Sequence, residues 1–338
     1  MGTLSRASDP TSGSIASPFT SAWRFSLKAL RAGIRRLPAA GQTKPDRELD
    51  PDLAADIIIQ SLESPNPSMI ARFGSTELSC LVNYTGVVEG TSHPLDFVLG
   101  KRPEWWWNPA ILQQMEKWSG FFPPTEAMAR RFGDLMLRDI PLIDVLGSWV
   151  PDERVFNREL TSARKVDLEL LNPYFSKVPW TKALAGRKVL VIHPFSATIQ
   201  SQYAKRELIF PDGLLPKFEL TTIRAVQSLA GEPTGFDNWF EALDSMVNEM
   251  ERTDFDICLV GCGAYGLPLA AHAKRMGKKG FHLGGSLQLL FGIRGKRWEN
   301  PGYNDVYDYS KLMNAHWVKP GEEERPKSAD KVEGACYW

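Results

Sequence analysis

Short apolar runs alternate with helically spaced apolar positions through the middle and the end of the chain. The apolar runs predict strands at 69–73, 142–146, 188–192, 257–260 and 280–283. Between them, apolar side chains that recur every three or four positions predict helices over 51–62, 78–84, 125–140, 157–171, 239–250 and 267–276. This alternation indicates an α/β fold, which we expect to be Rossmann-like, with a mostly parallel sheet and helices on both faces.

Each predicted strand runs directly into a loop of small or polar residues. In chain order the loops read FGSTE, GSW, HPFSAT, GCGAYG and LGGS. In an open parallel sheet the ligand crevice lies beyond the carboxyl ends of the strands. The pattern therefore predicts that these loops converge on one binding site.

The most informative unit lies between Asp256 and Gly285. Gly261, Gly263 and Gly266 follow its first strand at G-x-G-x-x-G spacing, which lets backbone amides approach an anion. A dinucleotide site also needs an acidic residue about 20 positions further on, where it would hold the ribose. No carboxylate lies between residues 265 and 297, which disfavours a nicotinamide or flavin cofactor. Glycines that only allow close packing of helix and strand remain an alternative.

The segments outside this alternation have distinct compositions. Residues 1–45 predict a disordered tail, 50–316 an enzyme domain with a Trp-rich insertion at 91–124, and 317–338 a C-terminal extension. Within the tail, residues 22–37 place apolar side chains at helical spacing among five basic ones. Such a segment would suit peripheral contact with an anionic membrane surface, while a frayed linker or a helix docked on the core are the alternatives.

Composition narrows the partners and the compartment. Forty basic and forty acidic residues cancel, so nothing indicates a nucleic-acid partner. The four cysteines lack paired C-x-x-C spacing, which favours reduced thiols over a zinc site. No apolar run approaches the roughly 20 residues of a membrane span, and no signal peptide is evident. We therefore expect a cytoplasmic protein, in peripheral contact with the inner face of the membrane if residues 22–37 bind lipid.

Several polar residues are candidates for chemistry at the predicted crevice. Glu77 follows a strand and would act as a general base or a metal ligand, unless it is only a first-turn glutamate favoured by the helix dipole. His193 would donate to a phosphate or transfer a proton, unless it bonds a neighbouring carbonyl. Asp254 and Asp256 form a D-x-D pair but precede their strand, so we expect a solvated turn. Trp105 and Trp106 would stack on an acceptor sugar, although tryptophans are more often core residues.

The segment Arg72-Phe73-Gly74-Ser75-Thr76-Glu77, together with residues 261–266 and 282–285, resembles the GT-D-fold glycosyltransferases. The resemblance covers roughly residues 55–298. It implies an enzyme that passes a sugar from a nucleotide sugar, typically UDP-glucose, to a glycan or glycoprotein in bacterial surface polysaccharide assembly. In this family the first loop is close to R-x-G-D-G-E, an acidic pair proposed to serve metal and donor.

Arg72, Gly74 and Glu77 match that pattern, and Ser75 stands where the first acid would be. A hydroxyl is a far weaker ligand for Mn²⁺ or Mg²⁺ than a carboxylate, so this loop does not require a divalent metal. Glu77 is the candidate ligand for a Mn²⁺ or Mg²⁺ ion if one binds. The predicted catalytic residues are Arg72, Glu77 and His193. The predicted nucleotide-sugar-binding residues are Gly74, Ser75, Ser196, Gly261, Gly263, Tyr265, Gly266, Gly284, Gly285, Arg294, Lys296 and Arg297.

Two other functions fit the same pattern. One is a Rossmann-type enzyme that uses an adenine cofactor, NAD or S-adenosylmethionine. The other is a non-catalytic module in which the tryptophans bind a glycan and the sheet is only a scaffold.

Overall fold

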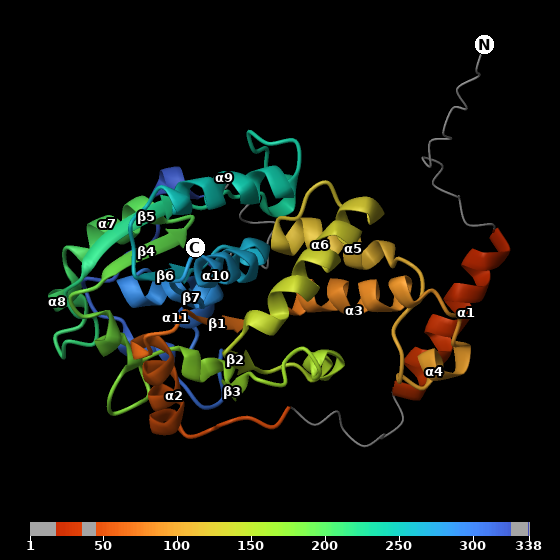
Figure 1. The fold of residues 1–338 in the computed structure, drawn as a ribbon, viewed down its shortest axis with the longest axis horizontal. Coiled ribbons are helices and arrows are strands. Elements are labelled where there is room, and N and C mark those ends of the chain that lie inside the picture. The colour runs from red at the N-terminus through yellow and green to blue at the C-terminus, as the bar shows by residue number, and fades with distance from the viewer. Residues whose placement is uncertain (1–17, 36–44, 326–336, 338) are drawn as a thin grey trace, which may run out of the picture.

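Seven parallel strands form the centre of the computed structural model, which describes residues 18–35, 45–325 and 337 (Figure 1). Their order in the sheet is β3-β2-β1-β7-β6-β4-β5. The strands are β1 Ser68–Arg72, β2 Val145–Ser148, β3 Arg164–Asp167, β4 Lys188–His193, β5 Glu219–Arg224, β6 Ile257–Val260 and β7 Lys279–His282. The α/β class and the strand-to-helix alternation predicted from the sequence are confirmed, and the sheet is parallel throughout.

The first and last strands are neighbours at the centre of the sheet. Ile70 of β1 lies opposite Phe281 of β7 on one side and opposite Val145 of β2 on the other. The chain therefore builds one half of the sheet outward from β1, and returns through β6 and β7 to complete the other half.

Helices cover both faces because successive strand residues point to opposite sides. In β4, for example, Leu190 and Ile192 belong to one core cluster, and Val189 and Val191 to the other. The first cluster packs under α3 Ser75–Glu89, α5 Pro109–Ser119, α6 Glu126–Asp139, α9 Trp239–Glu251 and α10 Gly266–Arg275. The second packs under α2 Pro51–Glu63, α7 Ser196–Tyr203, α8 Arg206–Ile209 and α11 Lys296–Glu299.

Shorter elements connect these layers. The 3₁₀ helices are η1 Ile140–Leu142, η2 Pro151–Phe156, η3 Leu168–Leu171, η4 Trp180–Leu184, η5 Leu229–Gly231, η6 Gly263–Tyr265, η7 Gly284–Phe291, η8 Tyr309–Leu312 and η9 Glu322–Glu324. Side chains cap several α-helices in the expected way: Asp50 accepts from the N–H groups of Asp52 and Leu53 at the start of α2. The α3 helix instead has Gly74 at its N-cap and no side-chain cap hydrogen bond.

The helix predicted over 157–171 is wrong. Val166 and Leu170 are four positions apart, which is a helical spacing, but residues 164–167 pair with β2 as strand β3 and residues 168–171 form η3. Both edge strands were missed by the pattern, because most residues of β3 (RKVD) and β5 (ELTTIR) are polar and neither strand contains a continuous apolar run.

The Trp-rich insertion contains two helices, α4 Pro94–Val98 and α5, joined by irregular segments. Trp107 lies in the core above the sheet, whereas Trp105 and Trp106 pack with Phe97 and with Leu27 of α1 Pro18–Arg35. For residues 22–35, the alternative of a helix docked on the rest of the protein therefore describes the structure. Within residues 18–35 and 45–325, no helix is both long and apolar enough to span a bilayer.

The ends of the chain are described only in part. Most of the predicted tail, residues 1–17 and 36–44, lies outside the described residues, as does the extension after residue 325 except for Tyr337. Residues 317–325 pack on the domain: Trp317 is buried, and Val318 forms a bridge with Ile293.

Candidate functional site

A cavity of about 350 Å³ lies over the carboxyl ends of the strands. Residues that follow six of the seven strands line it, and the Trp-rich insertion adds residues 118–120. Its position between the two halves of the sheet is the place where ligands bind in open parallel sheets. Among the predicted site residues, those on its walls are Arg72, Gly74, Ser75, Glu77, His193, Gly261, Gly263, Tyr265, Gly284, Gly285 and Arg297.

The glycines after β6 have two different roles. A Cβ atom on Gly261 would lie 2.6 Å from the carbonyl oxygen of Gly284 and 2.8 Å from the His193 ring, so glycine lets three loops meet at the cavity. Gly263 has φ +57°, which favours glycine, and it also lines the cavity. Gly266 is not on the wall. A Cβ there would lie 2.1 Å from the His282 ring, so this glycine serves packing of α10 against β7.

Arg72, the last residue of β1, lies on the wall of the cavity. Its guanidinium carbon is 5.7 Å from the centre of the Trp149 ring, and Trp149 is held by an N–H···O bond of 3.0 Å to Phe73. Arg72 also borders a second, 60 Å³ pocket that contains Glu169. None of the ion pairs among the described residues includes Arg72, so its charge is available to a ligand in the cavity.

Arg297 brings a second guanidinium to the same wall. Its guanidinium carbon is 5.9 Å from the Trp298 ring, 5.7 Å from the Tyr303 ring and 4.9 Å from the Tyr337 ring. It also donates a 3.5 Å hydrogen bond to the Tyr337 hydroxyl. Arg297 borders both pockets, as Arg72 does. Together the two side chains give the site a local positive charge that the neutral whole-chain balance conceals.

Glu77 is the only acidic residue on the walls of the larger cavity within the described part of the chain. It is the third residue of α3, and its carboxylate folds back over the first loop. A Cβ on Gly74 would lie 1.7 Å from Glu77 Oε2, so glycine at 74 leaves the space that this carboxylate occupies.

His193 and His282 line the cavity as neutral rings. Burial lowers the pKa of His193 to about 3, and burial with the nearby Arg72 charge lowers the pKa of His282 to about 3. His193 Nδ1 accepts a 3.0 Å hydrogen bond from the Phe195 N–H, which places its proton on Nε2. His193 can therefore donate a hydrogen bond to a ligand, but it is not suited to proton transfer near neutral pH.

Ser196 does not line the cavity, although it begins helix α7. The amides that follow it are occupied: Ala197 N–H donates to Glu324 at 2.8 Å, and Thr198 donates to the same buried carboxylate. A protein carboxylate thus fills the helix end where an anionic ligand would otherwise bind.

The remaining predicted binding residues also lie off the wall. Arg294 faces Glu299 at 3.8 Å, and Lys296 begins α11 beyond the cavity. Trp105 and Trp106, the predicted acceptor-binding residues, pack against α1 and α4, and neither lines the cavity. Trp118 is the tryptophan of the insertion that reaches the cavity, and it is 40% exposed.

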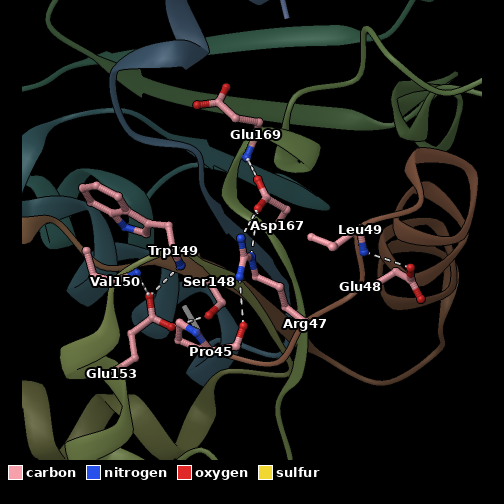
Figure 2. Close-up of polar contacts among 10 residues, drawn as sticks. All are labelled: Pro45, Arg47, Glu48, Leu49, Ser148, Trp149, Val150, Glu153, Asp167 and Glu169. Atoms are coloured by element: carbon pink, nitrogen blue, oxygen red, sulfur yellow. Dashed lines mark hydrogen bonds and ion pairs between the residues drawn. The ribbon is translucent and has the colours of Figure 1, made fainter. Parts of the chain in front are cut away.

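The sequence prediction missed residues whose importance comes from tertiary contacts. Glu153 is fully buried and its carboxylate accepts from the Ser148 hydroxyl and from the N–H groups of Trp149 (2.9 Å) and Val150 (3.1 Å), as Figure 2 shows. It thereby fixes the loop that carries Trp149. A glutamate five residues after a strand end, at the third position of a turn with proline at its start, was the available signal.

A second polar chain supports the smaller pocket. Arg47 pairs with Asp167 at 2.7 Å, and Asp167 Oδ1 accepts from the Glu169 N–H at 3.1 Å (Figure 2). Glu169 accepts from the Tyr309 hydroxyl, and burial raises the pKa of its carboxyl. These contacts fix Glu169 beside Arg72.

The residues present do not make a metal site by themselves. Among the side chains that the structure describes, no three of His, Cys, Asp or Glu gather closely enough to hold an ion. Glu77 would be an isolated carboxylate ligand.

Comparisons with family models, curated proteins and solved structures gave no match. The cavity and its residues therefore carry the functional argument.

Proposed function

We propose that this protein is a glycosyltransferase that moves a sugar from a nucleotide sugar, such as a UDP-sugar, to a glycan or glycoconjugate acceptor in bacterial envelope polysaccharide synthesis. One observation carries the proposal. The 72–77 loop and the glycine loop at 261–263 are distant in the sequence, yet both line one cavity with two arginines, Arg72 and Arg297. A diphosphate is the chemical group that such a combination of amides and guanidinium groups suits.

The cavity residues divide the reaction between them. Arg72 and Arg297 bind the diphosphate and stabilise its charge as the bond between the sugar and the phosphate oxygen breaks. The leaving nucleoside diphosphate keeps that electron pair. Glu77 accepts the proton of the acceptor hydroxyl, whose oxygen forms the new bond to the sugar. His193 donates a hydrogen bond from Nε2 to an oxygen of the nucleotide sugar. No step in this scheme passes through a metal ion.

The acceptor is assigned to the side of the cavity formed by the insertion. Trp118 lies on that wall and is partly exposed, so a sugar ring can stack on it. We assign this role to Trp118 in place of Trp105 and Trp106, because those two rings pack against α1 and α4.

Isothermal titration calorimetry with UDP, UDP-glucose, NAD and S-adenosylmethionine tests the proposal. UDP and its sugar conjugate should bind. Arg72→Ala should weaken them about tenfold or more, because it removes a charge-assisted contact worth about 1.5–3 kcal/mol. The matched control is Arg294→Ala, an arginine off the wall, which should leave affinity unchanged.

Three results would replace the proposal. Binding of NAD or S-adenosylmethionine alone would favour the adenine-cofactor enzyme. Glycan binding without nucleotide binding would favour the non-catalytic module. Equal loss in Arg72→Ala and Arg294→Ala would show that the affinity reflects general charge and not this cavity.

A further inference from the structure

Helix α1 is oriented with its charged side toward the rest of the protein. Its sequence, PFTSAWRFSLKALRAGIR, contains four basic residues and no acidic one. At about 100° per residue, the basic positions 24, 28, 31 and 35 fall within a sector of roughly 60°. Arg24 lies 5.2 Å from the Trp106 ring and Arg31 lies 4.5 Å from the Phe97 ring, so this sector faces the body.

The side of α1 that faces away from the body carries no charge. Trp23, Phe25 and Leu30 are 54%, 74% and 57% exposed, with alanines between them, whereas Leu27 beside the basic sector is buried. Water normally meets the charged side of an amphipathic helix. In α1 the apolar side is the one left exposed by the rest of the chain. This reversal indicates that the apolar side packs against a surface outside the chain.

The neighbouring helix α4 extends the apolar surface. It exposes Leu95 (79%) and, at its end, Leu99 (54%). In Figure 1, α1 and α4 form one end of the molecule, far from α7 and α8 at the other. Asp96 and Glu89, acidic residues at this end, both pair with Arg102, whose single charge offsets one of their two negative charges.

We propose that α1 and α4 dock this end of the protein on the surface of an anionic lipid bilayer, with α1 parallel to the membrane and Trp23, Phe25 and Leu30 inserted among the headgroups. Charge decides between lipid and a second copy of the chain. A second copy packed on the same face would add another four positive charges to this end and, from its α1, no acidic residue to offset them. Anionic headgroups instead attract those charges within about 10 Å.

Vesicle flotation tests this docking with the full chain. The vesicles are phosphatidylcholine alone and phosphatidylcholine with phosphatidylglycerol. We expect binding to the anionic vesicles, weaker binding to the neutral ones, and release as salt rises. Trp23→Ser/Phe25→Ser/Leu30→Ser should weaken binding at least about tenfold, because it removes the inserted apolar area.

The matched control removes exposed apolar residues elsewhere. Leu208→Ser and Val306→Ser change side chains that are 51% and 77% exposed outside α1 and α4, and should leave flotation unchanged. No residue of α1 or α4 lines the cavity, so nucleotide affinity, whatever its value, should be the same in the triple variant. The docking and the proposed transferase activity can therefore fail separately.

Two outcomes would overturn the lipid proposal. One is flotation that the triple variant leaves intact. The other is a protein that does not bind anionic vesicles and is a dimer by light scattering, with the dimer lost in the triple variant. The second outcome would assign the same face to a second copy of the chain.

Discussion

The Glu77 carboxylate lies over the α-carbon of Gly74, so these two residues of the first loop depend on each other. The backbone of Gly74 (φ −74°, ψ 142°) is one that alanine also adopts. Only the 1.7 Å approach of Glu77 Oε2 excludes a methyl group there. The glycine at position 74 thus sets the position of the side chain that we propose as the base.

Gly74→Ala should abolish transfer while costing about 1 kcal/mol of stability or less, because the methyl group displaces a flexible carboxylate and no backbone. Glu77→Gln should have the same effect on transfer, about 10²-fold or more, with nucleotide affinity retained. Transfer assays, calorimetry and urea unfolding measure the three quantities. Gly235→Ala is the control, because its Cβ meets nothing within 4 Å. A fully active Gly74→Ala protein would contradict the role of Glu77.

The two buried histidines predict a loss of stability in acid. Their pKa values are about 3 in the folded protein and 6.5 for a free side chain, so the unfolded chain binds more protons between these limits. Stability should therefore fall as the pH drops from about 6.5 toward 3. Urea unfolding across this range should show a shallower fall in His193→Asn than in the parent. Imidazole NMR signals of His193 and His282 that titrate between pH 6 and 7 would show that burial does not control them.

At the scale of elements, the loop after β2 depends on one buried acid. Three donors, the Ser148 hydroxyl and the amides of Trp149 and Val150, converge on Glu153. Trp149 in turn lies over Arg72. A residue outside the cavity thus positions an aromatic wall of the cavity.

Glu153→Ala should lower the free energy of unfolding by about 3 kcal/mol, because it leaves buried donors without an acceptor. Nucleotide affinity should fall with it, since Trp149 loses its support. Glu153→Gln keeps the size of the side chain and one acceptor oxygen, and should cost less in both measurements. Urea unfolding and calorimetry on the same preparations test this ranking. Equal effects of the two substitutions would mean that packing, and not hydrogen bonding, holds the loop.

Across the whole molecule, burial determines what the sequence alone reveals. The strand β6 (ICLV) is buried at every position, so its apolar run predicts it directly. The edge strands β3 and β5 have one covered side and read as polar segments. The loops at the carboxyl ends can be predicted to meet because parallel strands share one edge.

Residues that reach the cavity from other segments follow no such rule. Tyr303 and Tyr337 come from the C-terminal part of the chain, and Glu169 from a 3₁₀ turn after an edge strand. Their positions depend on tertiary contacts such as the ring contacts of Arg297, which have no period or motif in the sequence. The same holds for Ser196, whose helix end looks open until Glu324 is seen on it.

The pairing of β1 with β7 also orders events during synthesis. More than 200 residues separate the two strands, so one edge of β1 has no partner until the segment 279–282 leaves the ribosome. An unpaired central edge can join other chains, which makes the growing polypeptide dependent on protection at that stage. Gly284 and Arg297, which also line the cavity, leave the ribosome after that segment. A ligand can therefore stabilise the finished protein by mass action, but it has no site on the nascent chain through which to guide folding.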